Sequence, residues 1–362
     1  MHAIHPQALV RRGEKPSGVK LNLAANVRSL RRAVSLAPQP LDFGFSLDFG
    51  FWILNFQSPP CKFAFHAVRR GYAGPMNTLL RLSLVLGLAT LTVTAQDITT
   101  ALHGSFKGPL GLQLYSLRDS FNKDVPGTLD VVKNFGLVDV ELAGTYGQTP
   151  GQFKEQLTAR GLKAIAGHFG YGRFQNDPEG VAAEAKALGL RYAGCAWIDH
   201  SGTFDEKQCR EAAAVFNHAG AVLARHGLKF YYHTHGYEFQ PFGDGTLFDL
   251  LMHETEPKYV SFEMDVMWVV FPGQDPARLL AKYGPRWKLM HLKDLKKGVA
   301  GDLSGGTDPN HDVVIGTGQT DWPAVLKAAK TAGVKWYFIE DESKSVLDQI
   351  PQHLNYLEQV SW

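Results

Sequence analysis

The stretch FYYHTHGYEF, from Phe230 to Phe239, joins an apolar strand-like start to several groups that bind metals or move protons. We expect a buried strand over 229–235, in which residues two apart point to the same face. His233 and His235 would then project together, and Glu238 would follow just beyond the strand. Imidazole and carboxylate groups at such a position predict metal binding or acid–base chemistry.

Ionisable or aromatic side chains also end the other predicted strands. In chain order they are Glu141, His168, Trp197, Asp265, His291, Lys293, Asp294, Glu340, Asp341 and Glu342. Taken singly, each could be a polar loop residue or a helix cap. Together, several acids beside several imidazoles would repel one another and lose hydration unless a cation lay among them. Mixed carboxylate and imidazole ligands suit Mn²⁺, Mg²⁺ or Co²⁺, and the absence of cysteine from this set makes Zn²⁺ the less favoured alternative.

The strand ends recur because short apolar runs alternate with helical stretches from residue 108 onward. Eight such units in about 250 residues predict an α/β fold, a (β/α)₈ TIM barrel in a single domain. The strands are expected at 110–117, 138–142, 163–168, 192–197, 229–235, 260–266, 288–292 and 336–339. A doubly wound open sheet is the alternative, but no glycine-rich phosphate turn follows the first strand.

Side-chain alternation predicts which strand residues face the barrel interior. Asp265, His291 and Glu340 would occupy the last inward position of their strands. Met264 would then pack outward against the helices. Glu263, one layer below the strand end, is expected to be a buried and paired structural acid.

Composition separates an acidic body from a basic amino-terminal segment. The 362-residue chain has a formal net charge of +2, yet residues 96–362 hold 26 Lys and Arg against 32 Asp and Glu. An acidic body is a poor nucleic-acid binder, because affinity for phosphate backbones comes mostly from Lys and Arg. We therefore expect no nucleic-acid partner, which weighs against a DNA-directed metal phosphoesterase.

A secretory signal peptide is predicted within the chain, at 76–95. Arg81 supplies a positive charge, an apolar run follows over 82–91, and the segment ends in Val-Thr-Ala, as a cleavage site requires. The run is shorter than the roughly 20 residues that span a membrane, so no stable membrane insertion is expected after cleavage. The protein is expected to be secreted or periplasmic.

A signal peptide is read at the amino terminus, so an intact one behind Met76 favours translation from that methionine. Residues 1–75, which are Arg-rich and contain LDFGF twice, are interpreted as a non-native or disordered extension. Residues 96–107 would form a linker to the barrel of residues 108–362.

Four strings in the body carry a resemblance to a known family: YYHTHGYEF, EMDVMWVVFPGQDPARLLAKYGPRWKLMHLKD, GTGQTDWPAVLKAAKTAGVKWYF and the ending IED. They are similar to the sugar phosphate isomerase/epimerase superfamily, with its xylose-isomerase-like TIM barrel. The resemblance implies that Asp265, His291 and Glu340 bind a divalent metal. The family's fourth ligand is a glutamate at the end of strand five. Here Glu238 follows that position slightly late and His233 lies near it, so we expect Glu238 as the ligand.

The resemblance implies a divalent-metal-dependent sugar isomerase or epimerase, which acts through a metal-stabilised enediolate on a small, non-nucleotide sugar. The catalytic residues it implies are Glu238, Glu340, His235 and Lys293. Substrate contacts are expected from Glu141, His168, Trp197, His233 and Trp268.

A lyase or dehydratase that acts on a keto-sugar or keto-glycoside at the same metal site is the alternative. The additional imidazoles on strand five favour it. A carbohydrate-binding barrel without activity is a further class, against which the acid–base candidates weigh. The Gly-rich loop 294–320 is expected to act as a lid, and a homodimer is compatible with the fold.

Overall fold

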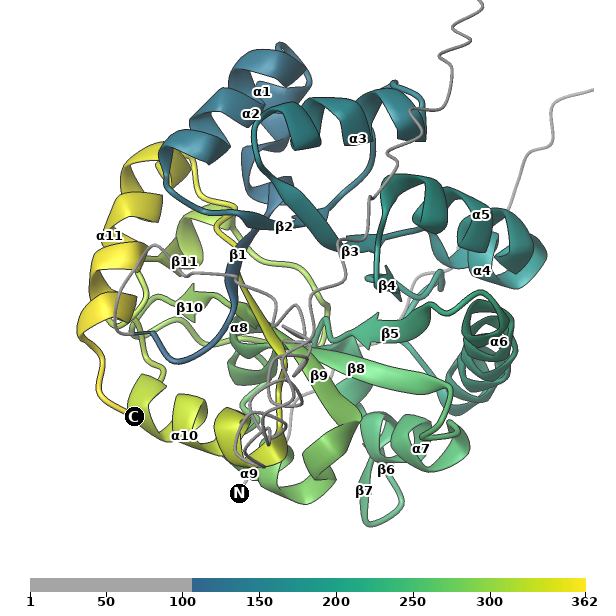
Figure 1. The fold of residues 1–362 in the computed structure, drawn as a ribbon. Helices are drawn as coiled ribbons and strands as arrows, with labels where there is room; N and C mark the ends of the chain where they lie inside the picture. The colour runs from purple at the N-terminus through teal and green to yellow at the C-terminus, as the bar shows by residue number, and fades with distance from the viewer. Residues whose placement is uncertain (1–105) are drawn as a thin grey trace, which may run out of the picture. The chain divides into compact units, whose positions relative to one another are not determined.

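The computed structural model describes residues 106–362, which form a closed barrel of eight parallel strands (Figure 1). The predicted (β/α)₈ barrel is therefore confirmed. The barrel strands are β1 Leu110–Gln113, β2 Asp139–Leu142, β3 Lys163–His168, β4 Tyr192–Cys195, β5 Lys229–His233, β8 Val260–Asp265, β9 Trp287–Leu292 and β12 Trp336–Ile339. The expectations for 1–75, for 76–95 and for 96–105 of the linker lie outside the described residues.

Helices surround the barrel and connect its strands (Figure 1). The longer ones are α2 Val125–Asn134, α3 Pro150–Ala159, α5 Pro178–Leu188, α6 Glu206–Arg225, α7 Leu247–Glu254, α9 Pro276–Tyr283, α10 Trp322–Ala332 and α11 Val346–Gln359. Short α1 Arg118–Phe121, α4 Tyr171–Asn176 and α8 Val266–Val270 lie between them. No helix within 106–362 is both long and apolar enough to cross a membrane.

Helix starts follow directly from the sequence. Helices α2, α5, α9 and α10 each begin after an aspartate whose side chain accepts a hydrogen bond from a first-turn N–H. Each also has a proline at one of its first two positions, where the missing N–H removes no hydrogen bond from the helix. Helices α5 and α10 end at a glycine in the left-handed conformation, Gly189 and Gly333.

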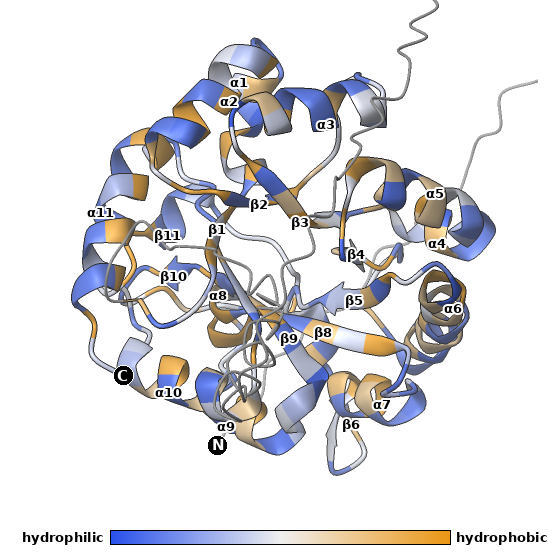
Figure 2. Cartoon of the chain, in the orientation of Figure 1, coloured by the Kyte–Doolittle hydropathy of each residue, from blue (hydrophilic) through white to orange (hydrophobic). Residues whose placement is uncertain are grey.

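The core has an outer layer and an inner layer. The outer layer lies between the strands and the helices and includes Met264 and Met290. Inside the barrel, a smaller cluster includes Leu289, Trp336 and Phe338. The predicted alternation of strand side chains is thus confirmed. Figure 2 shows the matching pattern on the helices, with apolar and polar residues interleaved along each ribbon.

Three strands end at least two residues earlier than predicted, and β8 ends one residue earlier, at Asp265. Strand β1 ends at Gln113 because its side-chain oxygen accepts a hydrogen bond from Tyr115 N–H at 3.0 Å, which starts a 3₁₀ turn over Leu114–Leu117. Strand β4 ends at Cys195 and β5 at His233, two residues short of the predictions. Beyond β5 the chain turns at Gly236, whose φ of 96° favours glycine.

The predicted lid loop contains a hairpin of β10 Asp294–Leu295 and β11 Asp312–Val313. The buried Asp294 carboxylate organises its base, since Oδ2 accepts hydrogen bonds from the N–H groups of Gly316 and Gly318 and from Trp322 Nε1, at 2.9 to 3.0 Å. Asp294 is therefore a structural acid of the loop.

Candidate active site

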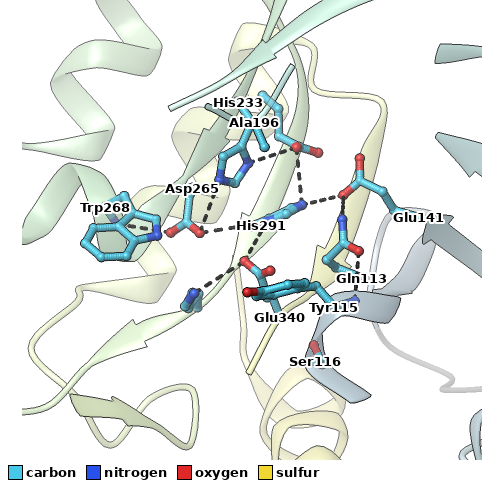
Figure 3. Close-up of polar contacts among 12 residues, drawn as sticks. Gln113, Tyr115, Ser116, Glu141, Ala196, His233, Asp265, Trp268, His291 and Glu340 are labelled. Atoms are coloured by element: carbon cyan, nitrogen blue, oxygen red, sulfur yellow. Dashed lines mark hydrogen bonds and ion pairs between the residues drawn. The ribbon is translucent and has the colours of Figure 1, made fainter. Parts of the chain in front are cut away.

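Four metal-binding side chains converge at the carboxyl end of the barrel: His233, Asp265, His291 and Glu340. One ligand atom from each lies within 4.8 Å of every other, and all four residues are buried. Figure 3 shows His291 at the centre of the group, with Asp265 and Glu340 on one side of its ring and Glu141 on the other. We call these four residues the metal cluster.

Strand register explains why residues so distant in sequence meet. Strand β9 lies between β8 and β12, with Asp265 opposite His291 and His291 opposite Phe338. Glu340 follows Phe338 by two residues and therefore points the same way. Strand β5 lies on the other side of β8 and brings in His233. Parallel strands place their carboxyl ends at one edge, where barrel enzymes build their active sites.

His291 presents its two ring nitrogens to different groups. Nδ1 lies 3.0 Å from Glu340 Oε2 and 3.7 Å from Asp265 Oδ2, inside the metal cluster. Nε2 lies 2.5 Å from Glu141 Oε2 and 3.2 Å from Glu263 Oε2, behind it. Carboxylates that hold the far nitrogen of a metal-binding histidine fix its ring and raise its basicity.

The donor set fits a divalent cation. Asp265 Oδ1 accepts a hydrogen bond from Trp268 N–H, but Oδ2 is buried without a hydrogen-bond partner. The nearest imidazole nitrogens are 3.7 and 3.9 Å from Oδ2, on His291 and His233. An orphaned carboxylate oxygen facing two imidazoles and a second carboxylate is the arrangement that a cation completes.

The pKa shifts within the metal cluster also favour a bound cation. Burial opposes the charged form of His291, but the charges of Glu263, Glu340 and Glu141 outweigh it and raise its pKa well above the ordinary value. Burial likewise opposes ionisation of Glu340, but Lys293 and His291 hold its pKa well below the ordinary value. The acids thus draw a proton onto His291, and a bound metal would displace that proton.

Glu263 is buried and paired, as predicted. Its Oε2 lies 3.0 Å from His233 Nδ1, 3.2 Å from His291 Nε2 and 3.3 Å from His168 Nε2. Burial, then the charge of Glu141, raises the pKa of Glu263 to about 7. His168, His233, Glu263 and His291 form a second group with metal-binding geometry, which shares two members with the metal cluster.

The structure does not bring Glu238 to the metal cluster, contrary to its expected place as the fourth ligand. Its Oε1 accepts a hydrogen bond from His235 N–H at 2.9 Å, within the turn that follows β5. Burial raises its pKa to about 7. Among the described residues it belongs to neither metal-capable group. Near the end of β5, His233 belongs to the metal cluster instead, and the chain turns at Gly236, with its positive φ, before it reaches Glu238.

Glu141, expected to contact substrate, instead lies behind His291 and does not line the cavity. Gln113 Nε2 donates to its Oε2 at 2.7 Å, and the Tyr231 hydroxyl donates to its Oε1. The ring of Tyr231 reaches that place over Gly194, where a Cβ would lie 2.1 Å from Tyr231 Cζ. Glu141 is thus a positioning residue for His291.

A cavity of about 490 Å³ opens above the metal cluster. Of the residues expected to act on or bind the substrate, seven line it: His168, Trp197, His233, His235, Trp268, Lys293 and Glu340. His233 and Glu340 belong to the metal cluster, so the cluster is accessible from the cavity. Residues 305–309 of the predicted lid loop form part of the wall, which places this loop over the site.

His235 and Lys293 differ in their protonation and charge. His235 Nδ1 lies 3.1 Å from the Ala196 carbonyl, which can only accept, so Nδ1 carries the proton and Nε2 keeps a lone pair. Burial, then the charge of Lys293, lowers the pKa of His235 to about 3. Burial opposes the charge of Lys293, but the charges of Glu340, Glu342 and Asp312 outweigh this effect and raise the pKa of Lys293 well above the ordinary value. Lys293 is therefore a cationic donor, and His235 is neutral.

Trp268 is packed more closely than a sugar platform would be. Its ring stacks on His235, with centroids 4.8 Å apart, and Lys293 Nζ lies 5.6 Å from its centroid. It is 4% exposed, whereas Trp197 is 38% exposed. Of the two tryptophans, Trp197 is the one that offers a ring to a ligand.

Tyr115 and Asp312 line the cavity but were not named by sequence reasoning, and Glu342 was named only as an acid at a strand end. Glu342 Oε1 accepts a hydrogen bond from Lys293 Nζ at 2.5 Å, and Asp312 Oδ2 lies 3.7 Å from the same atom. The acidic run after β12 signalled Glu342, but Tyr115 was hidden inside a strand predicted four residues too long. Asp312 lies in a hairpin with no clear pattern.

Comparisons with known proteins support the barrel fold. A family model described as a xylose isomerase-like TIM barrel matches residues 129–362. An inosose dehydratase from Geobacillus thermodenitrificans (strain NG80-2) is 30% identical over 154 residues, which is 40% of this chain and 51% of the relative. The matches to inosose dehydratases span 32% to 51% of those relatives' own length.

Solved structures share the barrel. A sugar phosphate isomerase/epimerase from Parabacteroides distasonis ATCC 8503 superposes with a TM-score of 0.58 at 25% identity, over 69% of this chain and 98% of that chain. A protein named IolI, solved with a bound zinc atom, superposes with a TM-score of 0.53 at 12% identity, over 69% of this chain and 95% of that chain. At that identity the likeness to the second protein is one of fold.

Proposed function

Because the chain belongs to the xylose isomerase-like TIM barrel family, we propose that it is a divalent-metal-dependent enzyme that isomerises or epimerises a small, non-nucleotide sugar. The observation that carries this proposal is the metal cluster itself, with its orphaned Asp265 oxygen, at the floor of a cavity. His233, Asp265, His291 and Glu340 would hold the ion. When bound, it would withdraw electron density from a carbonyl and an adjacent hydroxyl, which acidifies the neighbouring C–H group.

The side chains around the cavity supply the proton transfer. Glu340 lines the cavity in its ionised form, so its carboxylate can accept a proton from the carbon beside the carbonyl. His235 can accept a second proton or a hydroxyl hydrogen bond at Nε2. Lys293 remains an ammonium group and donates to a hydroxyl or to a developing negative charge.

A lyase that removes water or an alkoxide from a keto-sugar is the second candidate. The observation that favours it is His168, which lines the cavity between the carboxylates of Glu141 and Glu263. Burial opposes its charge, but those carboxylates outweigh it and raise its pKa. A protonated imidazole at this place can act as a general acid for a leaving oxygen. The inosose dehydratase relatives are consistent with this chemistry.

Solvent-deuterium exchange tests both candidates. The full chain, loaded with Mn²⁺ in D₂O, would be screened by NMR against hexoses, pentoses, inososes and 3-keto-glycosides. Deuterium at the carbon beside a carbonyl, with an epimer or isomer as product, would support the isomerase. Loss of water or of an alcohol from the same substrate would favour the lyase.

Glu340→Gln should abolish the exchange, while Glu179→Gln, an exposed acid paired with Arg225 and His226, serves as the matched control. Exchange that persists undiminished in Glu340→Gln would contradict the proposed role of this carboxylate. A chain with bound metal that exchanges no sugar hydrogen and eliminates nothing would contradict the proposed function.

A further inference from the structure

The cavity divides into two halves of unlike chemistry. The metal cluster comes from β5, β8, β9 and β12, which are consecutive around the barrel, so the other half of the mouth lies over β1 to β4. The aromatic residues of the cavity wall in that second half are Tyr115, Phe169, Tyr171 and Trp197. We call this side the aromatic half. Beside these rings, His168 and the exposed Asp199 are its ionisable lining residues.

Two of these rings are unusually open to solvent. Within residues 106–362 the exposed large hydrophobic side chains are Tyr115 at 43%, Trp197 at 38% and Leu347 at 49%. Tyr115 and Trp197 line the cavity, and Leu347 does not. They follow β1 and β4, three strands apart in the ring of eight, so they stand well apart around the mouth. Exposed aromatic rings that border a cavity mark a binding surface, because covering them removes apolar area from water.

Both rings are held in place before any ligand arrives. His200 stacks on Trp197, with centroids 5.1 Å apart and planes 20° from parallel, and Tyr237 contacts the indole in a T-shaped geometry at 4.7 Å. The guanidinium of Arg118 lies 4.5 Å from the centroid of the Tyr115 ring. The lid loop approaches Trp197 at Gly305, where a Cβ would lie 3.1 Å from the indole. Rings fixed in this way lose little conformational freedom on binding.

The cavity is larger than one sugar ring needs. Its 490 Å³ equals the volume of roughly sixteen waters, at the ~30 Å³ that a water takes in the liquid. A hexopyranose has only twelve non-hydrogen atoms, fewer than the oxygen atoms of those sixteen waters. A single ring at the metal cluster therefore leaves room across the aromatic half.

We propose that the aromatic half is a subsite for a second ring, so that the substrate is a glycoside whose metal-bound sugar carries the carbonyl group. That sugar reaches the metal cluster, and the ring beyond the glycosidic bond lies in the aromatic half, against Trp197. This inference rests on the proposed function, since the metal cluster fixes the first ring. The chemistry that the subsite recognises is a flat apolar face, which both an aryl group and the C–H face of a second pyranose present.

Binding measurements on the full chain test the subsite. The ligands are glucose, the phenyl α- and β-glucosides, maltose and cellobiose, and affinities are measured by calorimetry for wild type, Trp197→Ala and Tyr115→Ala. Leu347→Ala is the matched control, because it removes a side chain of similar exposure outside the cavity. We expect at least one glycoside to bind about tenfold more tightly than glucose, and Trp197→Ala to remove most of that difference. Leu347→Ala should leave it unchanged.

The ratio between glycoside and glucose within one protein keeps the test independent of any loss of stability. Preference for the phenyl glucosides identifies an aryl group as the second ring, and preference for a disaccharide identifies a sugar. Equal affinities for glucose and all four glycosides, or a preference that survives in both Trp197→Ala and Tyr115→Ala, would overturn the subsite. That result would leave the proposed function standing if deuterium exchange succeeds. Conversely, glycoside preference without any exchange or elimination would contradict the proposed function alone.

Discussion

At the scale of single residues, the site is organised around His291, whose ring is held from both sides. Glu340 and Asp265 contact Nδ1, and Glu141 and Glu263 contact Nε2. Glu141 and Glu263, behind the ring, therefore fix the orientation in which Nδ1 faces the metal cluster.

Glu141→Gln should weaken divalent-metal affinity by roughly 10- to 100-fold, because it removes the carboxylate behind His291 Nε2. The measurement is a titration with Mn²⁺ or Zn²⁺ against a competing chelator, with Glu179→Gln as the exposed-acid control. Unchanged affinity in Glu141→Gln would show that Glu141 does not position the histidine.

The sequence was enough to predict Asp265, His291 and Glu340 as neighbours, because each ends an apolar strand whose alternation is regular. The sequence was not enough to predict the fourth member of the metal cluster. The turn at Gly236 decides whether Glu238 or His233 lies beside the other three residues. A backbone with φ of 96° sends the carboxylate toward His235 N–H and leaves His233 at the strand end. The spacing of residues along the sequence does not reveal such a change in the direction of the chain.

At the scale of elements, helix limits were easier to predict than strand limits. The sequence patterns predict helices over 125–134, 178–188, 322–332 and 346–359. Helices α2, α5, α10 and α11 have these bounds, since Asp caps, prolines and glycines mark several of their ends. The end of β1 carries no such signal. It depends on the side chain of Gln113 folding back to Tyr115 N–H, a contact that an apolar alternating pattern conceals.

Asp249 in α7 gives a pH-dependent prediction for one element. It accepts hydrogen bonds from Thr246 N–H at 2.8 Å, from Lys282 Nζ at 2.6 Å and from the Tyr283 hydroxyl. Burial opposes its ionisation, but these hydrogen bonds, Lys282 foremost, outweigh it and hold its pKa below the ordinary 3.8. Its stabilising effect is therefore present above the unfolded pKa and is lost as the pH falls through the lower, folded value.

Asp249→Asn should lower the free energy of unfolding by about 1 kcal/mol at pH 7, as for loss of a helix cap. The difference from wild type should shrink below pH 4, in the window set by the depressed pKa. Urea unfolding at pH 7 and pH 3 measures both values, with exposed Glu155→Gln in α3 as a comparison. A difference that grew as the pH fell would contradict the direction of the shift.

At the scale of the whole molecule, the barrel gathers four buried acids around His291: Glu141, Glu263, Asp265 and Glu340. Such a group repels itself and is relieved by a cation, so metal binding should be linked to folding. A ligand at a hundredfold excess over its dissociation constant stabilises by about 2.7 kcal/mol.

Removal of the metal by a chelator should therefore lower the Tm by roughly 5 to 10 °C for a domain of this size. Differential scanning calorimetry with and without added Mn²⁺ measures the shift, and Asp265→Asn should show little of it. An equal response in Asp265→Asn would place the stabilising metal elsewhere.

The amino-terminal predictions concern residues that the structure does not describe. We propose that translation begins at Met76 and that the mature protein, secreted or periplasmic, starts at Gln96 after signal cleavage. Amino-terminal sequencing of the protein from its natural source would give Gln96. A mature start within residues 1–75 would contradict this proposal.

The metal content of two variants tests the central claim most directly. Elemental analysis of the purified protein, after saturation with Mn²⁺ and desalting, should find about one ion per chain in wild type and in Glu238→Gln. It should find almost none in Asp265→Asn, because Asp265 supplies the orphaned oxygen of the metal cluster and Glu238 lies outside it. Metal that is retained in Asp265→Asn but lost in Glu238→Gln would contradict the assignment of the site.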